Sequence, residues 1–228
     1  MPSQKWLNTA AFLAHRAMCG EDRPVIDGKP YPPFWWMEKK IRIFCEEGIS
    51  SQTIRIVQQA INQRFSEVGH EPFDFEIWGV HQSAQEQIKA SMVNGQLDEN
   101  KLFRICASEP WRDKAKGGIQ HGDIFITRRQ FLNDTVSWGA ADFKFGVMIL
   151  ALHGSRQTST DFLRRVVLHE ATHLVGYGYH CDQWKEVEGY LYDSNCSMHY
   201  SCHGEHLCDK CNDFIGAWWE RILKIAYV

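Results

Sequence analysis

The stretch LHEATHLVGYGYHC, residues 168–181, carries His169 and His173 four positions apart, with Glu170 beside the first. On an α-helix, such residues lie about 40° apart in azimuth and roughly 6 Å apart along the axis, so both imidazoles can point at one ion. Histidine suits both positions because it offers a neutral nitrogen near pH 7. The segment therefore predicts a helix that supplies two ligands of a metal site.

Glu170 adds a chemical role to this pair of histidines. It is poorly aimed for a third ligand, but it is well placed to hold a water on the metal. Zinc lowers the pKa of such a water toward 7, and a carboxylate can take its proton as the water attacks a carbonyl. The pattern therefore predicts hydrolytic chemistry with Glu170 as the base.

The residues after HEATH favour a built site over a chance pair of surface histidines. Gly176 stands where a glycine ends a helix in a left-handed conformation, and His180 follows directly after the expected turn. His180 is therefore the expected third ligand. The alternatives for this ligand are Asp182, Glu186 and Glu188. The two glutamates follow the predicted zinc helix too closely to lie on a separate helix that faces back to the metal.

The cysteines form a second group. The chain has eight, and five of them fall within residues 181–211: Cys181, Cys196, Cys202, Cys208 and Cys211. A cluster that ends in C-x-x-C indicates a metal site more than a disulfide framework, although buried thiols or a redox pair are the alternative. Cys208 and Cys211 are the strong half of such a site. Other ligands to consider are Cys202, His203 and His206.

Together these motifs resemble the archaemetzincins, a family within the metzincin metallopeptidases. Their pattern is H-E-x-x-H-x-x-G-x-x-H-C, then C-x-M, then C-x-x-C. The corresponding segments here are HEATHLVG (169–176), YGYHC (177–181), CSM (196–198) and CDKC (208–211). The adjacent His–Cys pair and the cysteine two positions before the methionine are the specific marks. The resemblance at motif level covers residues 162–211.

The chain departs from the family pattern in its spacing. One residue is added between Gly176 and His180, and Gly178 can absorb it because glycine tolerates unusual turns. The segment between Cys181 and Cys196 is longer than in the family, and the segment between Met198 and Cys208 is shorter. Because the two changes nearly cancel, they predict a rearranged loop with the site retained.

The resemblance implies a zinc-dependent peptidase with two zinc ions. The implied ligands of the catalytic zinc are His169, His173 and His180, with Glu170 as the general base. The implied ligands of a structural zinc are Cys181, Cys196, Cys208 and Cys211. Met198 would form the apolar floor below the catalytic metal. Tyr200, two residues past the methionine, is a candidate oxyanion stabiliser as in astacin-like metzincins, and a packed aromatic is the alternative.

Two other functions use the same residues and stay open. One is a catalytically inactive, zinc-stabilised module that binds a peptide or protein. The other is a metal-dependent hydrolase of a non-peptide amide. The partner expected for the main reading is a peptide or protein substrate.

Composition bears on whether the chain is globular and on whether it binds nucleic acid or a membrane. Hydrophobic residues make up 44% of the 228 residues, which is typical of a globular chain, and the net charge of -3 gives no basic surplus for nucleic acid. No apolar run approaches the roughly 18 residues of a membrane span. We therefore expect a monomeric cytoplasmic protein that binds neither nucleic acid nor a membrane.

The order of the predicted elements indicates an α/β (α+β mixed) fold. Strands are expected at 40–45, 73–80, 123–131 and 141–153, and helices at 51–65, 83–93, 161–175 and 212–228. We interpret 141–153 as an edge strand that continues into a buried one. The metzincin likeness implies a twisted mixed sheet with a backing helix and an active-site helix, and it places an extended peptide along the edge strand at 143–147.

Three regions are expected along the chain. Residues 1–38 are predicted to be an irregular lead-in, and residues 39–180 a metzincin-like N-terminal subdomain that ends in the zinc helix. Residues 181–228 are predicted to form a Cys-rich C-terminal subdomain with the methionine turn, the cysteine zinc site and the final helix.

Overall fold

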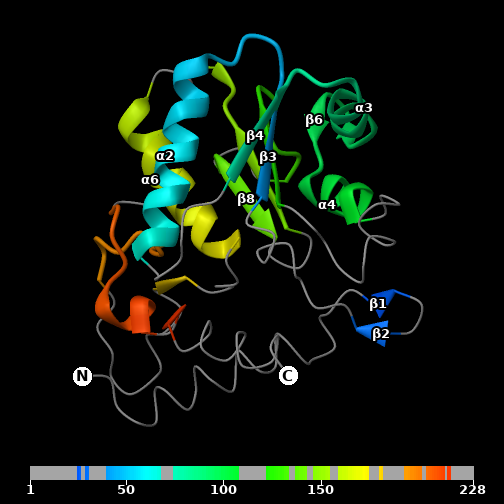
Figure 1. Cartoon of the computed structure of the whole chain (residues 1–228). Coiled ribbons are helices and arrows are strands. Elements are labelled where there is room, and N and C mark those ends of the chain that lie inside the picture. Colours follow the sequence, from blue (N-terminus) through cyan, green and yellow to red (C-terminus); the bar gives the residue numbers. More distant parts are fainter. Residues whose placement is uncertain are drawn as a thin grey trace.

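A five-stranded sheet forms the centre of the computed structural model, which describes residues 25–26, 29–30, 40–67, 74–107, 122–133, 137–142, 146–154, 159–174, 180–181, 193–201, 204–213 and 215–216. Its strand order is β4-β3-β7-β9-β8, and Figure 1 shows the sheet with β3, β4 and β8 labelled. The bounds are β3 Lys40–Cys45, β4 Asp74–Gly79, β7 Gly122–Thr127, β8 Gly139–Asp142 and β9 Val147–Ala151. The first four strands in that order are parallel and β8 runs antiparallel to β9, which confirms a mixed sheet.

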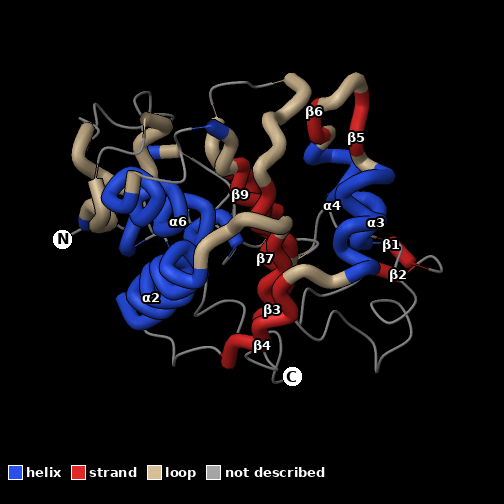
Figure 2. The backbone as a smooth tube through the Cα atoms, turned by 90° about the horizontal axis from the view of Figure 1, so that it is seen from above, coloured by secondary structure: helices blue, strands red, loops and turns tan. Residues whose placement is uncertain are grey.

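Helices cover both faces of this sheet. On one face lie α2 Ser51–Glu67 and α6 Thr160–Leu174, and on the other lie α3 Gln82–Ala90 and α4 Glu99–Ala107 (Figure 2). Successive residues of a strand point to opposite faces, so Ile43 joins the core under α2 and α6 while Phe44 joins the core under α3 and α4. The predicted α/β class is therefore confirmed, with α6 and its histidines packed on the sheet beside α2.

A serine caps the start of α2. The Ser50 hydroxyl oxygen accepts a hydrogen bond from the Thr53 amide at 3.1 Å, which satisfies one of the unpaired donors of the first turn. The buried face of this helix carries Val57, Ile61 and Phe65, as the helical spacing predicts. It also carries Arg64, which is fully buried among them.

The prediction of one continuous strand over 141–153 is wrong. The chain instead forms a hairpin, in which β8 at the sheet edge pairs with β9 inside it. Gly146 has φ 63°, a left-handed conformation that favours glycine and lets the chain reverse. The run of apolar residues that follows is the buried partner, so Val147, at the end of the predicted peptide-binding edge 143–147, lies inside the sheet. The edge strand on this side is β8, at 139–142.

The predicted helix at 83–93 ends earlier than expected. It stops at Ala90, and a small antiparallel pair follows, β5 Met92–Val93 with β6 Gln96–Leu97. Asn94 and Gly95 both have positive φ, at 50° and 82°, as expected for the Asn-Gly turn of a tight hairpin. Neither this turn nor α4, which follows it, was predicted from the sequence.

The ends of the chain test the remaining predictions only in part. Within 1–38 the structure describes β1 Val25–Ile26 and β2 Lys29–Pro30, an antiparallel pair. Residues 209–213 and 215–216 are helical, so the last helix begins before residue 212, and its predicted continuation over 217–228 lies outside the described residues. The division into three regions stays a prediction. Among the described helices, none combines the length and the apolar character needed to cross a bilayer.

Candidate metal centres

Three imidazoles converge at the end of α6. The distance between Nε2 atoms is 3.0 Å from His173 to His169, 3.1 Å from His169 to His180 and 3.3 Å from His173 to His180. The first two histidines lie one helical turn apart on α6, as the spacing predicts. His180 reaches the same point in spite of the added residue before it. Gly176 and Gly178, to which the turn was assigned, lie outside the described residues.

These distances fit a bound zinc ion. Zinc with ordinary Zn–N distances and tetrahedral geometry holds its nitrogen ligands about 3.3 Å apart. A hydrogen bond between two ring nitrogens needs a proton on one nitrogen and a lone pair on the other. Three nitrogens that face one point cannot meet this condition in all three pairs. A cation that accepts three lone pairs resolves this conflict. The three histidines are therefore able to hold a metal.

His169 is fixed in the tautomer that a metal requires. Its Nδ1 lies 2.7 Å from the backbone oxygen of Ser197, and because a carbonyl only accepts, Nδ1 carries the proton. Burial, with a further contribution from His173, holds the pKa of His169 well below its usual value. The ring is therefore neutral near pH 7, and its Nε2 lone pair faces the other two histidines.

Glu170 lies beside this group against the edge strand. The residue is 7% exposed, and burial raises the pKa of its carboxyl group to about 8. A methyl group placed on Gly139 of β8 would lie 2.5 Å from Cγ of Glu170 and 2.8 Å from its Oε1. The absence of a side chain at Gly139 is thus what leaves room for the Glu170 side chain.

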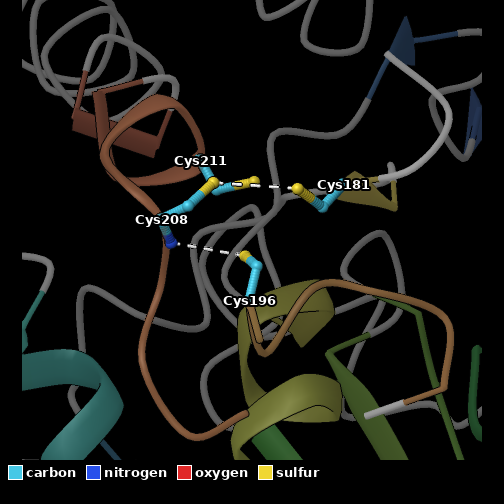
Figure 3. A group of neighbouring side chains, drawn as sticks. All are labelled: Cys181, Cys196, Cys208 and Cys211. Atoms are coloured by element: carbon cyan, nitrogen blue, oxygen red, sulfur yellow. Dashed lines mark hydrogen bonds between the residues drawn. The ribbon is translucent and has the colours of Figure 1, made fainter. Parts of the chain in front are cut away.

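Four cysteines form the second centre (Figure 3). Their sulfurs turn toward one another from three segments of chain and lie within 4.8 Å of each other: Cys181, Cys196, Cys208 and Cys211. Sγ of Cys181 lies 3.7 Å from Sγ of Cys208, and tetrahedral zinc with thiolate ligands separates them by about 3.8 Å. None of the cysteines in the described part of the chain is in a disulfide.

The electrostatics of this centre also fit a cation. Contact with the Cys181 thiol raises the pKa of Cys196 and of Cys211, with further contributions from the neighbouring sulfurs and from burial. Thiolates crowded at this distance repel one another, so they can ionise together only when a cation lies between them. The Cys196 sulfur also accepts a hydrogen bond, which the Cys208 amide donates at 3.3 Å.

Two short segments join the centres. His180 and Cys181 are adjacent, and the Cys181 amide donates to the backbone oxygen of Met198 at 2.6 Å. Cys196, Ser197 and Met198 follow one another, and the Ser197 carbonyl is the acceptor for His169. Met198 is fully buried. A displacement of either segment therefore moves ligand atoms of both centres.

The other predicted residues lie apart from these groups or outside the described residues. Tyr200 is 69% exposed, and its ring packs 5.3 Å from that of His199; its role as an oxyanion stabiliser stays a prediction. His206 pairs with Glu67, Nδ1 to Oε1 at 3.4 Å, and is not in the cysteine group. Outside the described residues are Asp182, Glu186, Glu188, Cys202 and His203.

Three residues that shape the site were not predicted from the sequence: Arg64, Gly139 and Ser197. Arg64 gives a signal in hindsight, because it occupies a core position of an otherwise apolar helix face. Ser197 stands between Cys196 and Met198 in the sequence, so its backbone necessarily lies between the two centres. Gly139 gives no signal, because its contact with Glu170 joins segments far apart in the sequence.

The sequence matches no protein-family model and none of the curated proteins compared. Two of the solved structures that are similar to the chain cover most of it. One is archaemetzincin from Methanopyrus kandleri, with TM-score 0.52 and 15% identity over 81% of this chain and 95% of that one. The other is a zinc-dependent peptidase from Methanocorpusculum labreanum (strain Z), with TM-score 0.51 and 16% identity over 77% of this chain and 99% of that one. The chain therefore has an archaemetzincin-like fold.

Proposed function

We propose that this chain is a zinc-dependent peptidase. The observation that carries the proposal is the convergence of three Nε2 atoms within 3.0–3.3 Å of one another, with the buried carboxyl group of Glu170 on the same helix. The names of the two similar structures, archaemetzincin and zinc-dependent peptidase, support it. His169, His173 and His180 would hold the catalytic zinc. The four-cysteine group would hold a second, structural zinc.

The chemistry follows from the groups in the site. Zinc held by three imidazoles supplies Lewis-acid polarisation of a carbonyl and a nucleophilic water at neutral pH. Glu170 takes a proton from the attacking water and passes it to the nitrogen of the departing amine. The Ser197 carbonyl accepts a hydrogen bond from Nδ1–H of His169 and so keeps Nε2 of that ring free of a proton. The edge strand β8, which lies against Glu170 at Gly139, is where an extended peptide would pair as a further strand.

The test is cleavage of a mixed peptide library by the zinc-loaded chain, read by mass spectrometry. We expect cleavage that stops after zinc is removed with a chelator and returns when zinc is added back. A hydroxamate should inhibit it, because hydroxamates bind a metal that has an open coordination position. A chain that binds the hydroxamate tightly but cuts no peptide would favour the hydrolase of a non-peptide amide. A chain that neither binds the hydroxamate nor cuts a peptide would favour the inactive binding module.

Proton release gives a separate prediction about Glu170. With a pKa of about 8, its carboxyl group is mostly protonated at pH 7 in the metal-free protein, and a divalent cation nearby favours the ionised form. Calorimetry of zinc uptake in buffers of different ionisation enthalpy should therefore show about one more proton released by the wild type than by Glu170→Gln at pH 7. Protons released by the cysteines are common to both proteins. The difference should vanish above the pKa of Glu170, and equal release at pH 7 would contradict the assignment.

A further inference from the structure

Arg64 is a buried charge that the proposed reaction does not use. It lies on α2, on the face that carries Val57, Ile61 and Phe65, and its side chain is fully buried. Transfer of a guanidinium group out of water is unfavourable unless its donors are all bonded and its charge is compensated. The partners of Arg64 therefore indicate what this arginine does in the molecule.

Those partners belong to four separate places in the chain. Nε donates to the backbone oxygen of Leu168 at 3.3 Å, and Nη1 donates to the Glu67 carboxylate at 2.7 Å. Nη2 donates to the Ser197 hydroxyl at 2.7 Å and to the backbone oxygen of Glu205 at 2.8 Å. The planar fork of the guanidinium group spans these acceptors at once.

Two of the partners control the orientation of His169. Leu168 precedes His169 on α6, so Arg64 bonds to the helix backbone at the position where the ligand side chain starts. The Ser197 carbonyl accepts the hydrogen bond from Nδ1–H of His169. The hydroxyl of the same residue accepts a hydrogen bond from Arg64, and its amide donates to the backbone oxygen of His206 at 2.8 Å. A carbonyl held in this way fixes the plane and tautomer of the imidazole that bonds to it.

Arg64 also bears on the cysteine centre. Ser197 follows Cys196 in the chain, so the same hydroxyl contact restrains a thiol ligand. Burial lowers the pKa of the Arg64 guanidinium, while the Glu67 carboxylate and, to a smaller extent, Cys196 and Cys211 oppose that shift. Four thiolates around a divalent cation leave a net negative charge, and a buried arginine is a suitable neighbour for such a group.

We propose that Arg64 is a positioning residue for both metal centres, which orients His169 through Leu168 and Ser197 and supplies a buried positive charge beside Cys196. The proposal depends on the metal ligands assigned under the proposed function. Its test measures metal binding, so it does not require that the chain cleave a peptide. A chain that binds zinc as expected but hydrolyses nothing would refute the peptidase and leave the role of Arg64 intact.

The main variant is Arg64→Lys, which keeps the charge but lacks the planar fork that reaches Leu168 and Ser197 together. Loss of an outer partner of a ligating histidine lowers metal affinity by roughly 10- to 100-fold, and we expect a loss of about 10-fold at the histidine centre. Zinc affinity is measured by competition with a chromophoric chelator. In the cobalt-substituted protein, the visible bands of the histidine centre should shift while the sulfur-to-cobalt charge-transfer bands stay.

Arg64→Met removes the charge as well. It should weaken the cysteine centre in addition, seen as a loss of the charge-transfer bands at cobalt concentrations that saturate the wild type. Arg164→Lys is the matched control. Arg164 on α6 bonds Gln63 and the Glu205 carboxylate, and it thus joins the same elements, but among the described residues it makes no hydrogen bond to Leu168 or Ser197. The zinc affinity and the cobalt spectra of Arg164→Lys should match those of the wild type.

Lower thermal stability alone, with wild-type affinity and spectra in both Arg64 variants, would overturn the proposal and leave Arg64 as a packing residue. If neither Arg64 variant folds, Ser197→Ala decides. It removes the hydroxyl that Arg64 holds and keeps the carbonyl that His169 uses. We then expect zinc affinity at the histidine centre to fall several-fold, and an unchanged affinity would overturn the proposal.

Discussion

Replacement of Glu170 by glutamine is expected to keep zinc in both centres and to lower the rate of peptide hydrolysis by about 100- to 10 000-fold, the range of general acid–base catalysis. Glutamine has nearly the shape of glutamate, so it fits the space that Gly139 leaves. It has no basic oxygen that can take a proton from the attacking water. The effect should therefore fall on kcat, and zinc content should stay unchanged by elemental analysis.

The control for this variant is Glu86→Gln. Glu86 lies on the exposed side of α3, where it accepts a hydrogen bond from Gln82, so the same change of charge there should leave kcat unaltered. A Glu170→Gln protein that cleaves peptides at a near-normal rate would show that another group acts as the base. Loss of zinc together with activity would instead show that Glu170 supports the metal site.

The parts of the site that follow from local geometry could be predicted from the sequence. His169 and His173 point to one place because residues four apart share a helix face, and a helix over this stretch was expected from its apolar spacing. The Cys-x-x-C pair likewise lies on one helical turn. The position of His180 was a harder inference, because it depends on a turn with one residue more than the family pattern. The structure brings its Nε2 to within 3.1 Å of His169.

The parts that could not be predicted depend on contacts between distant segments. Arg64 and Ser197 are 133 positions apart, and nothing in either stretch names the other as a partner. The hairpin at β8 and β9 was missed because an apolar run after an alternating one was interpreted as a single strand, whereas Gly146 reverses the chain. The Asn94–Gly95 turn was a readable signal that the expected helix over 83–93 concealed.

Gly139→Ala is the second variant with a large expected effect. The backbone at Gly139 does not require glycine for its conformation, because its φ lies outside the left-handed region. The added methyl group would lie 2.5 Å from Cγ of Glu170, closer than side-chain carbons approach, so either the carboxylate or the edge strand must move. A displacement of a catalytic group by about 1 Å lowers the rate by roughly 100-fold, and we expect a loss of that order in kcat.

The same variant should retain its zinc. The close contact of Gly139 is with Glu170, whereas the proposed zinc ligands are His169, His173 and His180. Gly216→Ala is the matched control, since a methyl group there meets nothing within 4 Å. Its kcat should equal that of the wild type. If Gly139→Ala also equals the wild type in kcat, Glu170 tolerates displacement, and the close packing of β8 on this carboxylate does not set the position of the base. If its zinc is lost as well, β8 supports the metal ligands and not the base alone.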